Sequence, residues 1–239
     1  MTATSIFGPP GVRDGARRTT RERARRRLLW TIWLGLLAGG IAIAVWASID
    51  DHFPADIAVG RWMQANDVAG QDVLGFMRDI GSGIAATVTV LVMVALLAVL
   101  RHRRLTAAGL TFLLGLVLIG VLKEVVDRPR TSIVFLEQHA SFDSPSFPSG
   151  HVMGTLVAEA LALYVAMRVV RRWWLRAPIA IWAIGVGAFQ PWVSVTTGVH
   201  WPSDVLGGIV WAAVVIIPGW LLLERARRAD ARAASPGEG

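Results

Sequence analysis

Residues 105–126 form the apolar run LTAAGLTFLLGLVLIGVLKEVV, in which the only charged side chains, Lys123 and Glu124, come near the end. A helix of about 20 apolar residues crosses the hydrocarbon core of a bilayer, because each residue adds about 1.5 Å along the axis. Hydrophobic residues make up 54% of the whole 239-residue chain, so the high apolar content is not confined to this run. The composition therefore predicts an integral membrane protein of the all-α class.

Five further apolar runs are long enough to cross a bilayer, which predicts a polytopic membrane helical bundle with six transmembrane helices. The predicted spans cover residues 28–49, 84–100, 105–126, 151–170, 177–197 and 203–223. The first span is longer than the apolar part of a signal peptide and no convincing cleavage site follows it, so we expect it to be retained. A short segment around Ile57 to Met63 predicts a helix at the membrane surface.

Arginine placement predicts the orientation of the bundle. Nineteen of the 24 basic residues lie in four segments, at residues 1–27, 101–104, 168–176 and 224–239. Because basic loops are retained on the cytoplasmic side, these segments and both termini are expected to be cytoplasmic. The loop from Asp50 to about Ser82 carries six aspartates and two arginines, which is consistent with an outer position.

The ends of the chain differ in composition from the apolar middle. Residues 1–24 and 229–239 have few apolar side chains to bury, which predicts two disordered cytoplasmic tails around a membrane domain at 25–228. The net charge of +7 does not indicate nucleic-acid binding, because the arginines lie at the ends of apolar runs. The absence of cysteine excludes disulfides, thiol catalysis and thiolate metal ligands.

Three polar clusters fall on the outer side of this predicted topology, at residues 123–131, 146–151 and 194–204. They contain a lysine, arginines, two histidines and an aspartate. Loops that are far apart in the sequence have no reason to place such residues on one face unless they build a common site. We therefore expect a phosphoryl-transfer site at the outer face, around His151 and His200.

The second cluster contains Pro148-Ser149-Gly150-His151, where a loop enters a predicted span. The N-terminus of a helix presents free N–H groups and a positive dipole end, which suits a phosphate. Gly150 allows close approach of the backbone, and the Ser149 hydroxyl can donate a further hydrogen bond. The alternative is an ordinary serine cap with a turn, which leaves His151 unexplained.

His200 and Asp204 lie four residues apart at the start of the last span, so a helix places them on one side. A carboxylate beside an imidazole fixes its tautomer and supports the positive charge that an attacking histidine acquires. Pro202 fits the first helical turn. The alternative is that Asp204 is a helix cap and His200 an interfacial residue.

Lys123 is the only lysine in the chain, and it lies beside the candidate phosphate site instead of in a cytoplasmic loop. A lysine at the end of a span can also simply extend its side chain to the interface. Of the two arginines that follow, Arg130 is the better phosphate ligand, and Arg128 is expected to pair with Asp127 or Glu124.

Glu159 is a carboxylate within a predicted span, two turns from His151. Ionisable side chains in the hydrocarbon region are costly and commonly functional, so Glu159 is a candidate for lining a lipid cavity or a proton path. The alternative is a protonated or hydrogen-bonded packing residue.

Taken together, these motifs resemble the type 2 phosphatidate phosphatase superfamily, the membrane relatives of bacterial acid phosphatases and vanadium haloperoxidases. The family pattern is Lys, six residues and Arg-Pro; then Pro-Ser-Gly-His; then Ser-Arg, five residues, His, three residues and Asp. Here the first motif is KEVVDRPRT, with Lys123 and Arg130 in place, and the second is intact. The third, VSVTTGVHWPSD, keeps His200 and Asp204 at the family spacing.

The resemblance implies roles for these residues. His200 would be the nucleophile that attacks phosphorus, Asp204 its orienting partner, and His151 the general acid that later activates water. The phosphoryl oxygens would be held by Lys123, Arg130, Ser149 and Gly150. No metal and no cofactor are implied, and vanadate is the expected inhibitor.

The implied substrate is a lipid phosphate or pyrophosphate of a bacterial plasma membrane, met on the outer side. Polyprenyl pyrophosphate, phosphatidylglycerophosphate and phosphatidate are all candidates, and membrane lipids are the expected partners. A phosphotransferase with the same phosphohistidine intermediate is an alternative. The oligomeric state is left open by the sequence.

Two positions depart from the family pattern, with Thr131 in place of a proline and Val193 and Ser194 in place of the Ser-Arg pair. An arginine binds phosphate through charge-assisted, often bidentate hydrogen bonds, so Ser194 leaves the predicted site one cation short. Either Arg128 substitutes for it, or activity is low or altered. The departure also permits a catalytically impaired relative that binds or transports a lipid phosphate.

Overall fold

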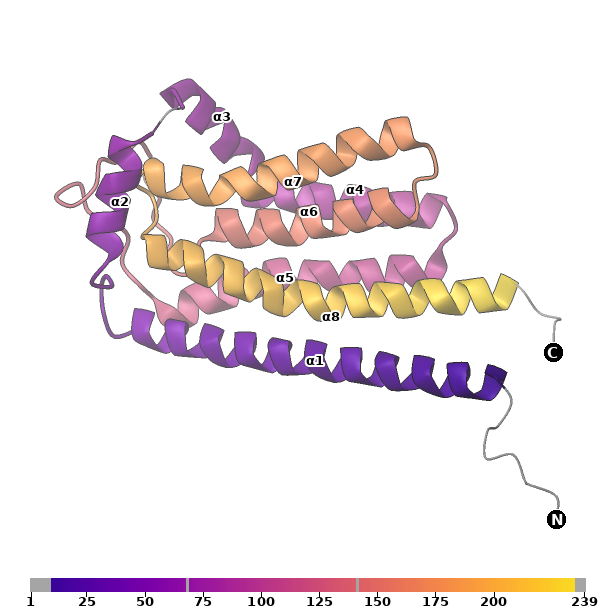
Figure 1. Cartoon of the computed structure of the whole chain (residues 1–239). Helices are drawn as coiled ribbons and strands as arrows, with labels where there is room; N and C mark the ends of the chain where they lie inside the picture. Colours follow the sequence, from indigo (N-terminus) through magenta and orange to yellow (C-terminus); the bar gives the residue numbers. More distant parts are fainter. Residues whose placement is uncertain (1–9, 68, 141, 235–239) are drawn as a thin grey trace, which may run out of the picture.

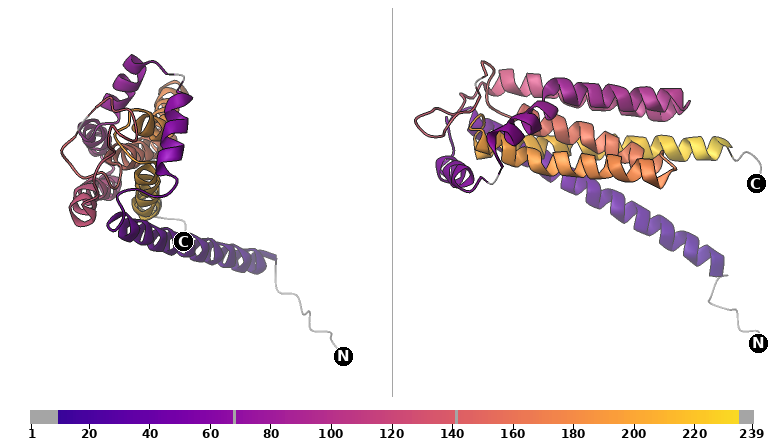
Figure 2. Two further views of the ribbon diagram at one scale, coloured as in Figure 1. Left: turned by 90° about the vertical axis from the view of Figure 1, so that its left-hand side faces the viewer. Right: turned by 90° about the horizontal axis from the view of Figure 1, so that it is seen from above.

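The computed structural model describes residues 10–67, 69–140 and 142–234, and every regular element within them is an α-helix. The helices are α1 (Pro10–Ala47), α2 (Asp56–Ala65), α3 (Gln71–Ile80), α4 (Gly83–Val99), α5 (Arg103–Val126), α6 (Gly150–Arg168), α7 (Trp173–Thr196) and α8 (Pro202–Ala234). The long helices α4 to α8 run side by side, and α1 packs along α8 and diverges from the bundle toward its own start (Figures 1 and 2).

One end of the bundle carries the short helices α2 and α3 and the long connection between α5 and α6 (Figure 1). At this end, called the site end below, α1, α5 and α7 finish and α4, α6 and α8 begin. The three polar clusters of the sequence all lie here. Helix α1 begins and α8 finishes at the opposite end, so the described chain starts and stops on the same side (Figure 1).

Five helices are long and apolar enough to cross a membrane, and the number is six if α3 and α4 are counted as one bent span. The chain is thus an all-helical, multi-pass membrane protein, and each of the six predicted runs lies on a helix. The predicted span 84–100 corresponds to α4, which has 17 residues and meets α3 at 46°. The predicted surface segment forms α2, whereas α3 was not predicted.

Helices α1 and α8 extend into segments that we expected to be disordered, because α1 begins at Pro10 and α8 continues to Ala234. Arginine and alanine are good helix formers, and lengthening an existing helix requires no new nucleation. The outermost parts of the predicted tails, 1–9 and 235–239, lie outside the described residues.

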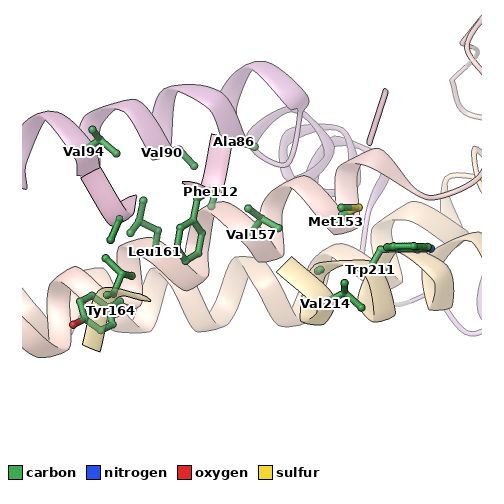
Figure 3. Close-up of a cluster of buried hydrophobic side chains, with 14 of the residues drawn as sticks. Ala86, Val90, Val94, Phe112, Met153, Val157, Leu161, Tyr164, Trp211 and Val214 are labelled. Carbon is green, nitrogen blue, oxygen red and sulfur yellow. The ribbon is translucent and has the colours of Figure 1, made fainter. Parts of the chain in front are cut away.

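Helix α6 lies at the centre of the core, in contact with α4, α5, α7 and α8. Its buried side chains Val157 and Leu161 pack with Val90 of α4 and Phe112 of α5 in the main apolar cluster (Figure 3). Packing on every side fixes α6 in position and orientation. Because α6 begins at Gly150, the same packing fixes the turn that carries the second motif.

Candidate active site

A cavity of about 310 Å³ opens at the site end, between α4, α5 and α6. Its polar wall is formed by Lys123, Arg130, Ser144, Gly150, His151 and His200. The remaining wall is largely apolar and is formed by α4, α5, α6 and the connection between α5 and α6, with Gly83, Thr87, Leu116, Ile119, Gly120, Gly154 and Phe142. The cavity thus joins a cationic, histidine-containing end to an apolar end within one volume.

The two histidines of the motifs face each other across this cavity. The His151 and His200 ring centroids are 6.4 Å apart, with the planes inclined by 65°. His151 lies in the first turn of α6, and His200 lies in the short connection between α7 and α8. Their separation leaves room for a phosphoryl group to contact both rings, which is what a nucleophile and a general acid require.

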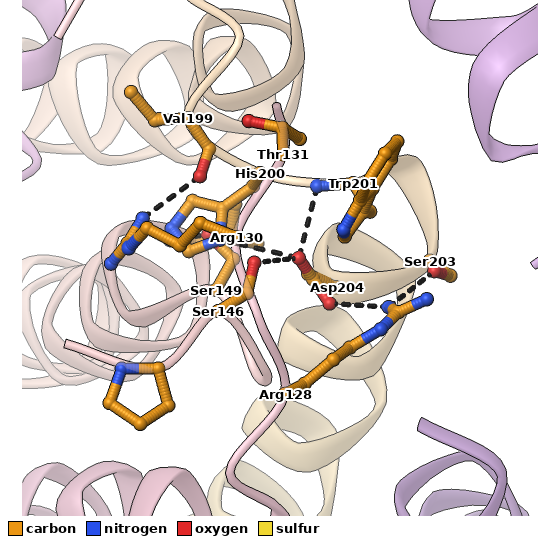
Figure 4. Close-up of polar contacts among 12 residues, drawn as sticks. Arg128, Arg130, Thr131, Ser146, Ser149, Val199, His200, Trp201, Ser203 and Asp204 are labelled. Atoms are coloured by element: carbon orange, nitrogen blue, oxygen red, sulfur yellow. Dashed lines mark hydrogen bonds and ion pairs between the residues drawn. The ribbon is translucent and has the colours of Figure 1, made fainter. Parts of the chain in front are cut away.

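Asp204 holds His200 from behind, at the centre of a buried polar network (Figure 4). Its Oδ2 atom is 3.6 Å from His200 Nδ1 and accepts hydrogen bonds from the Trp201 N–H at 3.0 Å and from the Ser146 hydroxyl. Its Oδ1 atom accepts from Arg128 at 2.6 Å. The His200 contact is slightly longer than a hydrogen bond, and contacts of this kind commonly tighten when substrate binds.

Burial lowers the pKa of the His200 imidazole to about 4, although the neighbouring Asp204 carboxylate opposes the shift. The ring is therefore neutral at pH 7. Since Nδ1 is directed at Asp204, the other ring nitrogen, Nε2, is the one available to the cavity. A neutral imidazole with a free lone pair is the form that can attack phosphorus.

Arg128 is buried and does not line the cavity, so its position corrects the sequence-based expectation. Its guanidinium pairs with Asp204 and, at 3.1 Å, with Asp56, and donates to the Ser203 hydroxyl at 2.8 Å. The expected partners were Asp127 and Glu124. Helix α5 ends in a left-handed turn at Asp127, with φ of 47°, and the chain then carries Arg128 into the bundle.

Asp56 is a member of this network that the sequence analysis missed. It is 2% exposed at the start of α2, and it accepts hydrogen bonds from the Ser203 N–H at 2.8 Å and from the Ser203 hydroxyl at 2.6 Å. It thereby ties α2 to the first turn of α8, beside Asp204. An aspartate at the start of a surface helix carries no sequence signal for such a role.

Lys123 and Arg130 both reach the cavity, as predicted from their spacing. Lys123 donates to the Pro145 carbonyl oxygen. Arg130 donates to the carbonyl oxygens of Ser144 at 2.7 Å and Val199 at 2.8 Å. Burial lowers the pKa of Arg130, yet a guanidinium remains charged at neutral pH. These bonds hold two cations at the mouth of the cavity.

Ser149 acts as the cap of α6, because its hydroxyl accepts a hydrogen bond from the Val152 N–H. The Ser149 N–H donates to the Asp204 carbonyl oxygen at 3.0 Å. Ser149 itself is buried and does not line the cavity, so the capping alternative holds for its side chain. The N–H groups of Gly150 and His151 have no partner among the described residues, and they are the donors that this helix end offers to an anion.

The two departures from the motif pattern lie away from the cavity lining. The Thr131 hydroxyl donates to the Gly198 carbonyl oxygen, two residues before His200. Gly198 has φ of +69°, and an added Cβ would lie 1.8 Å from the Glu137 carbonyl oxygen, so only glycine fits there. Ser194 is 2% exposed on α7, and its hydroxyl has no partner within residues 10–67, 69–140 and 142–234.

Glu159 is largely buried on α6 and is not part of the cavity wall. One of its carboxylate oxygens has no hydrogen-bond partner in the described part of the chain. Its functional role stays a prediction.

The sequence model of the PAP2 superfamily matches residues 104–228, which include all three motifs. A curated relative is the undecaprenyl-diphosphatase BcrC of Bacillus subtilis, 34% identical over 112 residues, and the match covers 45% of this chain and about half (52%) of the relative. The fold resembles the crystal structure of a transmembrane PAP2 type phosphatidylglycerolphosphate phosphatase from Bacillus subtilis. That comparison has a TM-score of 0.64 at 21% identity and covers 81% of this chain and 96% of the other.

Proposed function

Because this chain belongs to the PAP2 superfamily, we propose that it hydrolyses the phosphate or pyrophosphate ester of a membrane lipid without a metal, through a phosphohistidine on His200. One observation carries the proposal: the cavity joins two histidines and two cations at one end to an apolar wall at the other. A phosphate headgroup fits the first end, and the start of a hydrocarbon tail fits the second.

In the first half of the reaction, Nε2 of His200 attacks phosphorus and forms a P–N bond. The P–O bond to the leaving group breaks, and His151 gives its proton to the departing oxygen. Asp204 stabilises the positive charge that His200 gains, and Arg128 and Asp56 hold Asp204 in place. Lys123, Arg130 and the Gly150 N–H stabilise the negative charge on the phosphoryl oxygens.

In the second half, His151 removes a proton from a water molecule, and the resulting hydroxide attacks phosphorus. The P–N bond breaks, which returns the electron pair to His200 and releases phosphate. The 6.4 Å between the ring centroids supports this division of roles, because each ring reaches the phosphoryl group from its own side.

Among the candidate substrates, a polyprenyl pyrophosphate is favoured. The curated relative is named an undecaprenyl-diphosphatase. The apolar cavity wall also contains Gly83 of α4 and Gly120 of α5, where no atom lies within 4 Å of an added Cβ, so there is space for the methyl branches of a polyprenyl tail. Phosphatidylglycerophosphate and phosphatidate share the same headgroup chemistry and are the comparison substrates.

The arginine distribution supports an outer location for the site. The described ends of α1 and α8 lie opposite the site end, in arginine-rich sequence, so both termini would be cytoplasmic. A substrate would then be met in the outer leaflet of a bacterial plasma membrane. Labelling of a single cysteine at Ser144 by an impermeant reagent in intact cells tests this orientation.

The test of the reaction is phosphate release from the three lipids by protein purified in detergent, with a chelator present throughout. Wild type is expected to release phosphate, and His200→Ala is expected to release none. Alkaline quenching, in which phosphohistidine survives, should trap the labelled intermediate on wild type alone. Phosphate release that persists in His200→Ala would remove the nucleophile assignment.

A catalytically impaired relative is the second candidate, favoured by the buried, unpartnered hydroxyl at Ser194. It predicts binding of the same lipids without phosphate release. Product analysis with added acceptor lipids distinguishes a phosphotransferase, which would form a new phosphate ester.

A further inference from the structure

The family pattern places a phosphate-binding arginine at position 194, and here the residue is serine. Ser194 lies one turn beyond Gln190 on the same face of α7. Both side chains are buried, and neither the Ser194 hydroxyl nor the Gln190 amide has a hydrogen-bond partner in the described part of the chain. This face of α7 therefore presents polar groups to the bundle without supplying a cation.

The end of α3 packs directly on this face. An added Cβ at Gly81 would lie 2.3 Å from the Gln190 side chain, so the backbone that follows α3 touches Gln190. The Thr155 hydroxyl of α6 donates to the Gly81 carbonyl oxygen at 3.3 Å. Gly81, Thr155 and Gln190 therefore mark one level of the bundle at which α3, α6 and α7 meet.

One helical turn toward the site end from this level, each helix presents a residue of interest. On α6 the turn leads from Thr155 to His151, and on α7 from Gln190 to Ser194. On α3 it leads from Gly81 back to Arg78. His151 and Ser194 are therefore each one turn from this junction toward the site end, and Arg78 is one turn from it along α3, which is inclined by 46° to α4.

The Arg78 side chain points inward and has no strong partner. It shares a face of α3 with Leu74, which is fully buried. Within the described residues its one ion pair is with Asp79 at 3.5 Å, where the aspartate side chain is 75% exposed and that of Arg78 is 25% exposed. An exposed pair of this kind is weak.

We propose that Arg78 is the third phosphate-binding cation of this site and supplies from α3 the charge that Ser194 no longer supplies from α7. The inference rests on the proposed function for its chemistry. The ligand is the phosphoryl group of the lipid, and the guanidinium binds its oxygens from the α3 side of His151. Arg78 thus completes a set of three cations with Lys123 and Arg130.

The test replaces Arg78 in two ways and uses a distant arginine as control. Arg78→Ala removes the side chain, and Arg78→Gln keeps its length and polarity without its charge. Arg61→Ala is the matched control, because Arg61 lies on α2 and donates to the exposed carbonyl oxygen of Phe135. Loss of one transition-state donor is expected to lower kcat by about 10²- to 10³-fold in both Arg78 variants and to leave Arg61→Ala unchanged.

An exchange variant separates this role from a structural one. Arg78→Ala combined with Ser194→Arg returns the cation to α7. The double variant is expected to have a kcat at least tenfold higher than that of Arg78→Ala alone. A structural defect on α3 would not be repaired from α7. If both Arg78→Ala and Arg78→Gln keep kcat within threefold of wild type, the proposal is wrong.

A second assay does not depend on turnover. It measures the binding of orthovanadate from the rise in the melting temperature of the protein that vanadate causes. Wild type that binds vanadate but releases no phosphate overturns the proposed function only. Vanadate affinity that falls at least tenfold in Arg78→Gln, with the melting temperature of the free protein unchanged, still supports Arg78 as a phosphate ligand. Unchanged vanadate affinity in that variant refutes it.

Discussion

Replacement of Arg128 by methionine tests the buried network that supports Asp204. Methionine keeps much of the length and apolar volume of the arginine stem but has no charge and no donor. The change removes the 2.6 Å hydrogen bond to Asp204 and the 3.1 Å bond to Asp56. Both carboxylates are then left without a cation, at 0% and 2% exposure.

Removing one partner of a buried ion pair typically costs about 3–5 kcal/mol, because the remaining charge is neither paired nor hydrated. We expect Arg128→Met to lower the free energy of unfolding by this amount. Asp56→Asn in the same chain removes one of the two unpaired charges. The double variant should therefore be more stable than the sum of the single effects predicts, by about 1–3 kcal/mol.

The assay is equilibrium unfolding in mixed detergent micelles, followed by helical circular dichroism, with phosphate release measured in parallel. The control is Arg61→Met, because Arg61 is exposed and its replacement is expected to change stability by less than about 0.5 kcal/mol. Phosphate release by Arg128→Met should fall with the loss of Asp204 positioning. A cost below about 1 kcal/mol, or additive effects of the two substitutions, would refute the network as described.

Two further predictions concern His200 and the apolar cavity wall. Burial lowers the pKa of His200 to about 4 against 6.5 in the unfolded chain, so the unfolded state takes up the proton first as pH falls. The contribution of His200 to the free energy of unfolding should therefore drop by about 3 kcal/mol between pH 6.5 and pH 4, and His200→Asn should reduce the pH dependence of unfolding in this window. Gly120→Leu places a side chain where no atom lies within 4 Å of an added Cβ, so it should raise KM for the lipid and leave kcat for a short, soluble phosphate ester unchanged.

The long helices could be predicted from the sequence because each carries a long apolar run, which packs in the bundle core or faces lipid. The predicted runs 105–126 and 151–170 differ from α5 and α6 by two residues or fewer at each end. Helix α3 could not be predicted in this way, since its ten residues include Asp72, Arg78 and Asp79. Its apolar residues Val73, Leu74, Met77 and Ile80 recur at helical spacing, but ten residues are too few to cross a bilayer, so a search for long apolar runs misses this helix.

Five of the residues that line the cavity, namely Lys123, Arg130, Gly150, His151 and His200, could be proposed from the sequence because the motifs keep their spacing within a turn of a helix or a tight loop. The support behind them could not. Arg128 and Asp56 are separated by 72 residues, and their pairing depends on how α2 folds back over the start of α8. From sequence alone, Arg128 had two nearer carboxylates, and nothing local ruled them out.

The support for the motifs comes from the segment that precedes them in the chain. Asp56, at the start of α2, pairs with Arg128 and accepts hydrogen bonds from Ser203, and so helps to fix the guanidinium that holds Asp204. Arg78, in the last turn of α3, lies one turn before Gly81, which contacts Gln190 of α7. Both helices lie between α1 and α4, outside the residues 104–228 that match the family. The three motifs alone therefore show that an arginine is absent at position 194. They do not include Asp56 and Arg78, which α2 and α3 bring to the same end of the bundle.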